Sequence, residues 1–547
     1  MKPASREKRI DKKRPRTSRA SQAQPVTGVA GLLRRLSPWQ WAAAGILTGA
    51  AVLRLVELTL KPLHHDEGVN GSFLTTLFRG GYYRYDPSNY HGPSLYYFAW
   101  IITTFNSLFY GKQGLSTFAI RLTTVLFGVG LVWLLLCLRR ELGSFGALVA
   151  AALAAVSPGM VFFSRYFIHE ILFVFFTLGV LVAVLRFRRA SQPRYLMLAA
   201  ASAALLGTTK ETWVITVAVW MIALPCTWAW IRLRREKDVS GASSVHLPVP
   251  DVLANSGTRV WRGWEIYAAA ALLFLAVWVL LYSSFFTNFP QGVLDSVRTF
   301  GYWFKTSKSD HSYGVTKYLE WLWQQEAPVL ILGAVGIVIA LWRARSRFAV
   351  FTAFWSLGIL AAYSLVSYKT PWCALNILLP GIIMAGYGLE RLYQLRPAHG
   401  WKALVPHSRG AIALAAIAAG VGLYQAIDLN FYRYDDDTRA YVYAHTQRDF
   451  LGLVNEIDSI AAGQPAGKDI GILVMSPEHW PLPWYLRDYK NAVWGKSADP
   501  TEPILVVHES QVLDVESKFG AKYRLISSHD LRPGNRLYLY LRRDLQP

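Results

Sequence analysis

Apolar runs of about 20 residues recur along most of this chain, and they constrain its fold more than any other feature. A helix of that length crosses the hydrocarbon core of a bilayer and satisfies its own backbone hydrogen bonds. The runs predict spans at residues 38–60, 117–138, 146–163, 168–186, 194–209, 211–232, 264–285, 328–343, 347–368, 373–391 and 409–428. The sequence therefore predicts a polytopic α-helical membrane protein with about 11 transmembrane helices.

The chain carries 57 lysines and arginines against 35 aspartates and glutamates, a formal net charge of +22. The excess lies in an N-terminal tail, residues 1–36, and in short loops between the apolar runs, so it does not indicate a nucleic-acid partner. Basic loops remain on the cytoplasmic side of a membrane. We expect a disordered cytoplasmic tail attracted to anionic membrane lipids.

The same rule decides how residues 94–111 (SLYYFAWIITTFNSLFYG) are interpreted. With about 11 spans and a cytoplasmic N-terminus, the inner loops contain the basic clusters at 139–140, 186–189, 232–237, 343–347 and 391–402. Counting 94–111 as a crossing would move most of these clusters outside. Because Tyr and Trp favour the membrane interface, we predict a juxtamembrane helix within a first outer loop, residues 61–116.

Residues 429–547 have a different pattern from the transmembrane domain, 37–428. Short runs such as GILVMS, ILVVHE, YRLIS and LYLYL alternate with the helix-like stretches TRAYVYAHTQRDFLGLVNEI and SQVLDVESKFG. We predict an extramembrane α/β domain, which the parity of the spans places on the outer face of the cell membrane. The inner loop 236–263 is rich in Ser, Pro and Gly and is predicted to be a flexible link.

An acidic pair, Asp66 and Glu67, follows the first predicted span. The pair precedes a helix-like run, so a carboxylate there could simply cap the helix. Its position at the membrane edge, ahead of His91-Gly92-Pro93, also suits contact with a lipid headgroup. One carboxylate could then act as a general base on an acceptor hydroxyl. The residues alone leave both interpretations open.

Three further polar clusters lie at predicted outer ends of spans. They are SRYFIHE with Arg165, Tyr166, His169 and Glu170, LGTTKETW with Lys210 and Glu211, and SYKTPW with Lys369 and Trp372. Each could be a snorkelling cation, a helix turn with an ion pair or a membrane anchor. Together they place carboxylates beside cations on one membrane face. Departure of a lipid phosphate needs such cations, because developing negative charge must be stabilised.

The order of these motifs resembles that of the GT-C glycosyltransferases that use polyprenyl-phosphate sugars, especially protein O-mannosyltransferases and lipid A aminoarabinose transferases. The resemblance covers roughly residues 38–391. It rests on DEG at Asp66–Gly68, HGPSL at His91–Leu95, Arg121-Leu122, Arg165-Tyr166 with Glu170, and Thr209-Lys210. In place of the families' His-Pro-Pro-Leu, this chain has Gly92 for the first proline and an inserted Ser94. HHDEGVN and YHGPSLYY most resemble the flippase-activity-associated family of archaeal-type N-glycosylation.

The resemblance implies an inverting transfer on the outer face. Asp66 would deprotonate the hydroxyl of a protein, lipid or glycan acceptor, which attacks a sugar linked to polyprenyl phosphate, while Glu67 supports the site. Lys210, Arg165 and Lys369 or His91 would hold the departing phosphate. His65, Tyr166, His169, Glu170, Glu211 and Trp372 are the other residues expected to bind substrate.

No cofactor is expected to be required. His64, His65, Asp66 and Glu67 leave a divalent metal open as an alternative, although adjacent residues chelate poorly. The alternative function is a non-catalytic or transport protein that assists flipping of lipid-linked sugars. A flippase needs polar residues through the middle of the membrane, whereas the polar clusters of this chain stay at the ends of the spans. An oligosaccharyltransferase is disfavoured because the C-terminal region has no WWDYG-like element.

Overall fold

The computed structural model describes residues 36–89, 91–239, 263–306, 312–395 and 407–545. The predicted tail lies outside these ranges except for residue 36, and so does most of the predicted link 236–263. The chain forms two units, residues 1–42 and 43–547. In the first unit Ser37 and Gln40 cap the start of α2 (Pro38–Leu55), with 2.8 Å between the Ser37 nitrogen and Gln40 Oε1. Every feature below belongs to the second unit.

The apolar runs form long helices. They are α5 (Thr117–Leu136), α9 (Glu170–Ala190), α11 (Trp213–Val239), α12 (Trp264–Tyr282), α14 (Lys317–Arg343), α15 (Arg347–Leu365), α16 (Ala374–Tyr393) and α17 (His407–Ile427). Within the described ranges, eight helices are long and apolar enough to cross a membrane, or nine if the bent pair α7 (Ser144–Val156) and α8 (Pro158–Ser164) is one span. The predicted multi-pass helical fold is confirmed. The remaining predicted spans, α2 and α10 (Pro193–Gly207), have 18 and 15 residues and are not among these helices.

Two predicted spans are not the simple helices that the sequence suggested. The run 146–163 bends by 57° between α7 and α8. The bend lies at Ser157, whose ψ of 125° is non-helical, because the following Pro158 disfavours the helical conformation of the residue before it. The run 328–343 is the second part of α14, which begins at Lys317 and is kinked at Glu326, two residues before Pro328.

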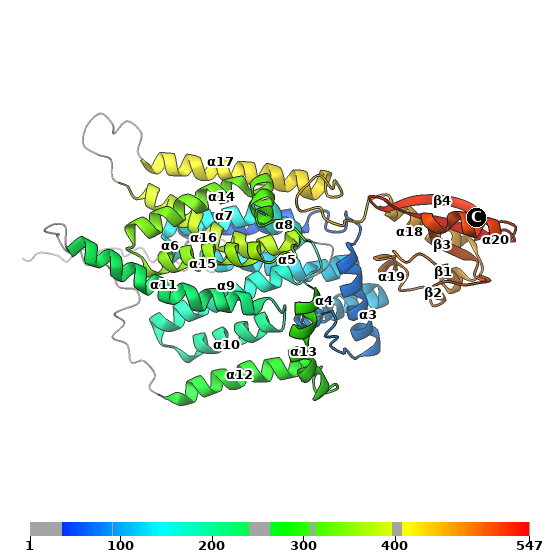
Figure 1. Ribbon diagram of the computed structural model, residues 1–547, viewed down its shortest axis with the longest axis horizontal. Coiled ribbons are helices and arrows are strands. Elements are labelled where there is room, and N and C mark those ends of the chain that lie inside the picture. Colours follow the sequence, from blue (N-terminus) through cyan, green and yellow to red (C-terminus); the bar gives the residue numbers. More distant parts are fainter. Residues whose placement is uncertain (1–35, 90, 240–262, 307–311, 396–406, 546–547) are drawn as a thin grey trace, which may run out of the picture. The chain divides into compact units, whose positions relative to one another are not determined.

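Helix α16 lies at the centre of the transmembrane bundle. It is buried along most of its length and contacts α7, α14, α15 and α17 (Figure 1). Helices α3 (His65–Gly80), α4 (Ser94–Tyr110) and α13 (Gln291–Thr306) lie at one end of the long helices (Figure 1). Helix α4 is the segment predicted to be juxtamembrane. Its 17 residues are not among the span candidates, and its exposed Phe105, Leu108 and Phe109 suit an apolar environment.

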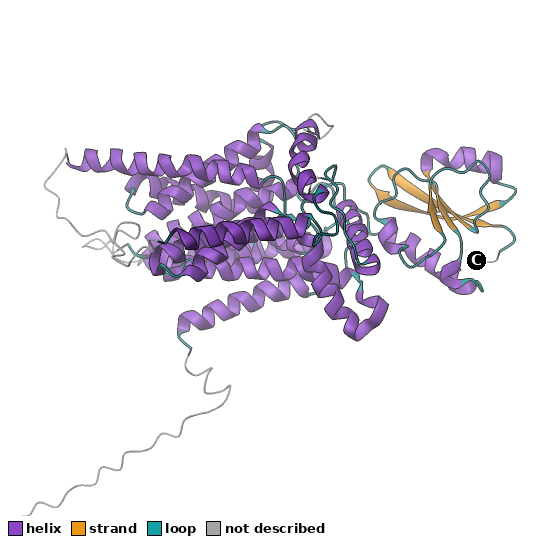
Figure 2. Ribbon diagram, turned by 90° about the horizontal axis from the view of Figure 1, so that it is seen from below, coloured by secondary structure: helices purple, strands orange, loops and turns teal. Residues whose placement is uncertain are grey.

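The C-terminal residues form the predicted α/β structure. Its strands are β1 (Ile472–Val474), β2 (Ala492–Trp494), β3 (Ile504–His508), β4 (Tyr523–Arg532) and β5 (Asn535–Arg542), in the order β2-β1-β3-β5-β4. Strands β2, β1 and β3 are parallel, and β5 is antiparallel to β3 and β4. Helices α18 (Phe450–Gly463) and α19 (Leu482–Tyr485) cover one face and α20 (Val512–Phe519) the other, so helices flank the strands on both sides (Figure 2). The short strand β2 was not predicted.

One stretch of this domain differs from its predicted conformation. The helix-like pattern began at residue 438, but α18 begins at Phe450. Residues 438–449 instead run beside the turn that precedes α3. Thr446 Oγ1 donates a 2.7 Å hydrogen bond to the Leu63 carbonyl, and His64 Nε2 lies 3.0 Å from the Tyr443 carbonyl oxygen. These tertiary hydrogen bonds replace the ones that a longer helix would have made within itself.

Candidate active site

The first turn of α3 contains both members of the acidic pair. His64 is the N-cap: its Nδ1 accepts a 3.1 Å hydrogen bond from the Asp66 backbone nitrogen. The Glu67 carboxylate completes the capping box by accepting a 3.0 Å hydrogen bond from the His64 backbone nitrogen. The capping role that the sequence left open for the pair therefore falls to Glu67. The Asp66 side chain takes no part in it.

Glu67 is fully buried behind the helix. Its two carboxylate oxygens accept hydrogen bonds of 2.8 and 2.7 Å from Arg121, and Oε1 accepts another of 2.8 Å from the Phe167 backbone nitrogen. Burial alone would raise the pKa of Glu67, but the Arg121 guanidinium and the two backbone N–H groups bring it below its usual value. Glu67 is therefore a charged group with a fixed position, and it does not line the cavity described next.

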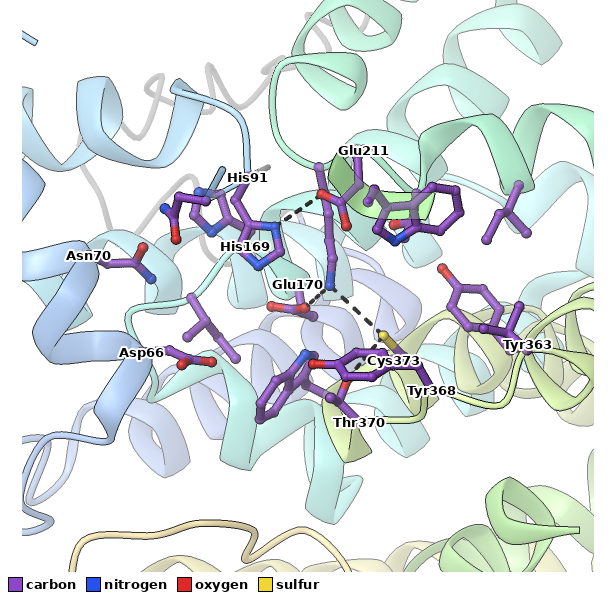
Figure 3. A pocket seen from close by; sticks show the side chains of 18 of the residues that line it. Asp66, Asn70, His91, His169, Glu170, Glu211, Tyr363, Tyr368, Thr370 and Cys373 are labelled. Carbon is purple, nitrogen blue, oxygen red and sulfur yellow. Dashed lines mark hydrogen bonds and ion pairs between the residues drawn. The ribbon is translucent and has the colours of Figure 1, made fainter. Parts of the chain in front are cut away.

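Asp66 faces a cavity of about 330 Å³ on the other side of the turn. Its side chain is half-buried, and no residue in the described ranges forms a hydrogen bond or an ion pair with its carboxylate. Figure 3 shows this carboxylate in the same space as Glu170, His91 and Cys373, which come from other segments of the chain. Asp66 is thus a carboxylate that is open to a ligand.

Lys210 lies in the cavity wall between α10 and α11. Its Nζ forms an ion pair with Glu170, and 3.9 Å separates Nζ from Cys373 Sγ. Burial alone would lower the pKa of Lys210, but the nearby Cys373, Glu170 and Glu211 raise it well above its usual value. The cavity therefore contains a lasting positive charge on a side chain whose position is fixed.

The His91-Gly92-Pro93 segment is bonded through its backbone to the same junction. His91 and Lys210 form an isolated antiparallel bridge, and the Gly92 nitrogen donates a 3.0 Å hydrogen bond to the Thr209 carbonyl. A Cβ at position 92 would lie 2.0 Å from the Thr208 carbonyl oxygen. A proline there would have neither the space nor the N–H group. This close approach explains why the chain has HGPSL where the resembling families have His-Pro-Pro-Leu.

Two histidines extend this wall. His91 Nδ1 lies 3.0 Å from Glu211 Oε2, and His169 Nε2 lies 3.0 Å from the Gly92 carbonyl oxygen. Because a carbonyl only accepts, Nε2 carries the proton of His169 and Nδ1 is an acceptor. That Nδ1 is buried and has no hydrogen-bond partner among the described residues. Burial alone would raise the pKa of Glu211, but His91 and Lys210 lower it, so this carboxylate stays charged.

The structure brings together most of the residues that the sequence singled out. The cavity is lined by Asp66, His65, His91, His169, Glu170, Lys210, Glu211 and Trp372. These residues come from five separate segments of the chain, which the predicted topology places on one membrane face. Their convergence agrees with the expectation of a common site.

Arg165, Tyr166 and Lys369 do not line the cavity. Arg165 donates to the carbonyls at the end of α2 and just beyond it, including those of Val56 at 2.5 Å and Glu57 at 2.6 Å. Lys369 donates to the Ser364 carbonyl at 2.9 Å and to that of Val366, at the end of α15. These cations neutralise the negative ends of helices. Tyr166 Oη lies 2.5 Å from His445 Nδ1.

Several lining residues were not predicted. They are Asn70, Asn89, Thr212, Trp303, Tyr318, Tyr363, Tyr368, Thr370 and Cys373, with a few apolar side chains. Asn70 had a usable signal, because it lies four residues after Asp66 and therefore on the same helical face. Tyr363 had none, because aromatic residues in apolar runs are common and only helix packing turns this one inward.

Within the described ranges, no group of three or more His, Cys, Asp or Glu side chains is arranged to hold a metal ion. The cavity nevertheless contains Asp66, Glu170 and Glu211. The expectation that no metal is required stays a prediction.

Comparison with known proteins identifies the fold. A family model described as dolichyl-phosphate-mannose-protein mannosyltransferase matches residues 92–241. The crystal structure of ArnT from Cupriavidus metallidurans bound to undecaprenyl phosphate matches with a TM-score of 0.59 and 16% identity, over 92% of this chain and 98% of that one. The apo structure of ArnT matches with a TM-score of 0.60 and 15% identity, over the same shares of the two chains, 92% and 98%.

The oligosaccharyltransferase of Archaeoglobus fulgidus, solved with zinc and sulfate, matches with a TM-score of 0.52 and 12% identity, over 86% of this chain and 68% of that one. No curated protein sequence matches. The chain therefore has the GT-C fold, and the predicted resemblance is confirmed at that level.

Proposed function

We propose that this protein is a membrane glycosyltransferase that moves a sugar from a polyprenyl-phosphate carrier to an acceptor hydroxyl, with inversion at the anomeric carbon. The observation that carries the proposal is Asp66. Its carboxylate has no side-chain partner in the described ranges and faces a cavity that also contains the buried ammonium of Lys210. An unpaired base and a fixed cation in one enclosed space suit a reaction that removes a proton and releases a phosphate.

The proposed step is a single displacement. An acceptor hydroxyl within hydrogen-bond reach of Asp66 gives its proton to the carboxylate, and its oxygen forms a new bond to the anomeric carbon. The bond between that carbon and the phosphate oxygen breaks, and its electron pair leaves with the lipid phosphate. Attack from the side opposite the leaving group inverts the configuration of the sugar.

Lys210 and His91 are the groups suited to stabilise the leaving phosphate. Each faces the cavity and is oriented by a carboxylate, Lys210 by Glu170 and His91 by Glu211. The Lys210 ammonium in such an enclosed site stabilises developing negative charge more strongly than it would in bulk water. The ArnT structure that contains undecaprenyl phosphate supports a polyprenyl-phosphate carrier.

His169 is suited to hold the sugar. Its Nδ1 is a buried acceptor without a partner among the described residues, next to the segment that contains His91. A sugar hydroxyl that donates to this atom would satisfy it and fix the orientation of the ring. A buried polar atom without a hydrogen bond costs folding free energy, so an unpaired His169 Nδ1 suggests that a ligand supplies the missing hydrogen bond.

The test is turnover of purified protein in lipid nanodiscs, supplied with isotope-labelled mannosyl phosphoryl undecaprenol and a panel of peptide, lipid and glycan acceptors. The expected result is release of lipid phosphate together with a glycosylated product of opposite anomeric configuration, both lost in Asp66→Asn. Retention of configuration would refute the single displacement. Movement of the labelled headgroup across the bilayer without bond cleavage would support the transport function instead.

A further inference from the structure

A row of aromatic rings leads from the cavity onto the C-terminal domain. His65, which lines the cavity, has its ring centre 6.1 Å from that of Trp480. The His479 ring lies 5.9 Å from Trp480 and 5.0 Å from Trp494. Trp494 is 37% exposed, and the other three rings are partly exposed. We call His65, Trp480, His479 and Trp494 the ring row.

The ring row lies where an open α/β sheet binds ligands. His479 and Trp480 follow β1, and Trp494 is the last residue of β2, so three of the rings are at the carboxyl ends of parallel strands. Strand β1 lies between β2 and β3, and the chain continues from β1 toward β2 but from β3 toward β4 and β5 on the opposite side. In open α/β sheets ligands usually bind at the carboxyl ends of the strands beside such a divergence, and β1 is one of the two strands that flank it here.

Polar groups flank the rings. Arg532 Nη2 donates a 2.7 Å hydrogen bond to the Trp480 carbonyl and lies 3.2 Å from His65 Nδ1. Arg532 Nη1 forms a 2.9 Å ion pair with Glu478, whose side chain is 49% exposed. The pair adds no net charge to the row. It therefore offers hydrogen bonds without attracting a charged ligand.

The row is held firmly against α3. At Gly68 a Cβ would lie 2.8 Å from the Pro481 Cβ, so the residue after Trp480 touches the helix that contains Asp66. His65 is adjacent to Asp66 in sequence and belongs to both the cavity and the row. A ligand along the rings therefore ends beside the proposed base.

We propose that the ring row binds the acceptor and that this acceptor is a saccharide, an inference that rests on the proposed function. The C–H faces of a pyranose ring carry partial positive charge and pack well on the electron-rich face of an aromatic ring. The sugar hydroxyls bond to Glu478 and Arg532, the few fixed polar groups that give such a surface its specificity. Neighbouring rings lie 5.0–6.1 Å apart and are tilted by 34–51° to one another, so successive pyranose units of a bent saccharide each meet one ring and the last hydroxyl reaches Asp66.

The experiment measures binding without any donor. Full-length protein in nanodiscs is mixed with mannose, glucose, galactose or N-acetylglucosamine trisaccharides, or with a Ser/Thr-rich peptide, and saturation-transfer NMR reports which ligand protons touch the protein. We expect transfer to the C–H protons of at least one trisaccharide. Binding in Trp494→Ala should be about fivefold weaker, because one stacking surface is lost. Glu478→Gln should also weaken binding without changing the thermal unfolding.

The matched control is Leu513→Ala on α20, where the leucine is 82% exposed but lies away from the ring row; it should bind like the parent. Asp66→Asn should keep saccharide binding while it loses transfer, which separates this inference from the proposed function. Three results would overturn the proposal. They are saturation transfer to the peptide but to no trisaccharide, saturation transfer to no ligand at all, and trisaccharide binding by Trp494→Ala that is as strong as binding by the parent. Binding without any transfer by the parent protein would leave it standing and refute the proposed function.

Discussion

The charged side chains on the two sides of the first turn of α3 have different kinds of partner. Behind the turn lies a buried anchor, Arg54, Lys61, Arg121 and Arg165, which lies against the turn and the adjacent helix ends. In front lies the cavity, where Lys210 and His91 pair with Glu170 and Glu211.

The difference lies in what accepts the hydrogen bonds. Arg54 and Arg165 donate mainly to backbone carbonyls, such as Ala155 at 2.9 Å and Glu57 at 2.6 Å. Carbonyls take up the terminal nitrogens of the Arg165 guanidinium, and its Nε is buried without a partner among the described residues, so neither part of the group faces the cavity. Lys210 and His91 instead line the cavity, Lys210 beside Glu170 and His91 beside Glu211. The partner of a buried cation therefore indicates its role.

The strongest test of this contrast is Asp66→Asn. The amide has nearly the same shape but cannot take a proton, so turnover should fall by about a thousandfold, within the range that general bases contribute. The melting temperature should not change, because no described side chain bonds to Asp66. A loss of turnover smaller than tenfold would remove Asp66 from the proton-transfer step.

Glu67→Gln should act on stability instead. It leaves the Arg121 guanidinium, which is 0% exposed, without a countercharge, and should lower the free energy of unfolding by about 3 kcal/mol. Denaturation followed by circular dichroism in detergent measures this change. The matched control is Asp488→Asn, whose partner Arg79 is 39% exposed, with an expected loss of less than about 1 kcal/mol. Equal losses in both variants would contradict the anchor.

The same variant gives a pH test. The pKa of Glu67 is lower in the folded protein than its ordinary value of 4.5, so the unfolded chain binds the proton more readily. The stabilisation from this group is complete above that ordinary value and is lost as the pH falls below it toward the folded pKa. Between pH 5 and pH 3, about the titration range of a carboxyl group, Glu67→Gln should lose less stability than the parent. Parallel pH profiles would contradict the assignment.

Two lysines sharpen the contrast between a ligand contact and a helix cap. Lys210→Met removes the ammonium beside the proposed phosphate and should lower turnover about a hundredfold. Lys369→Met removes donors to the Ser364 and Val366 carbonyls and should mainly lower the melting temperature. Initial rates and thermal unfolding, measured on both variants, separate the two effects. Turnover that falls more in Lys369→Met than in Lys210→Met would reverse the roles of the two lysines.

The smallest expected effect concerns the link to the C-terminal domain. Thr446→Val keeps the shape of the side chain but removes the 2.7 Å hydrogen bond to the Leu63 carbonyl, and should cost about 1 kcal/mol of unfolding free energy. Chemical denaturation measures this loss. Turnover should fall by less than about tenfold, because Asp66 stays on the same helix face. An unchanged unfolding free energy would show that this contact does not stabilise the turn.

Much of the fold followed from the sequence because apolar runs of membrane length leave few alternatives. The acidic pair, the His91 segment and Lys210 were found because charged residues at the ends of spans are conspicuous. The pattern could not show that Arg165 and Lys369 turn toward helix ends. Their partners are backbone carbonyls, which every residue has, so the sequence does not reveal which ones they contact. Nor could it distinguish Asp66 from Glu67 by residue type, because only the N-cap geometry at His64 gives the two carboxylates different faces.

The hydrogen bond between Leu63 and Thr446 joins residues 383 positions apart. Synthesis proceeds from the N-terminus, so the turn that holds Asp66 emerges long before the segment that completes it. A nascent chain that already contains Asp66, Arg121 and Lys210 therefore still lacks the Thr446 contact to its first turn. The turn that holds Asp66 therefore gains its last contact only after the C-terminal domain has reached the same side of the membrane. A chain that ends before Thr446 would lack this contact.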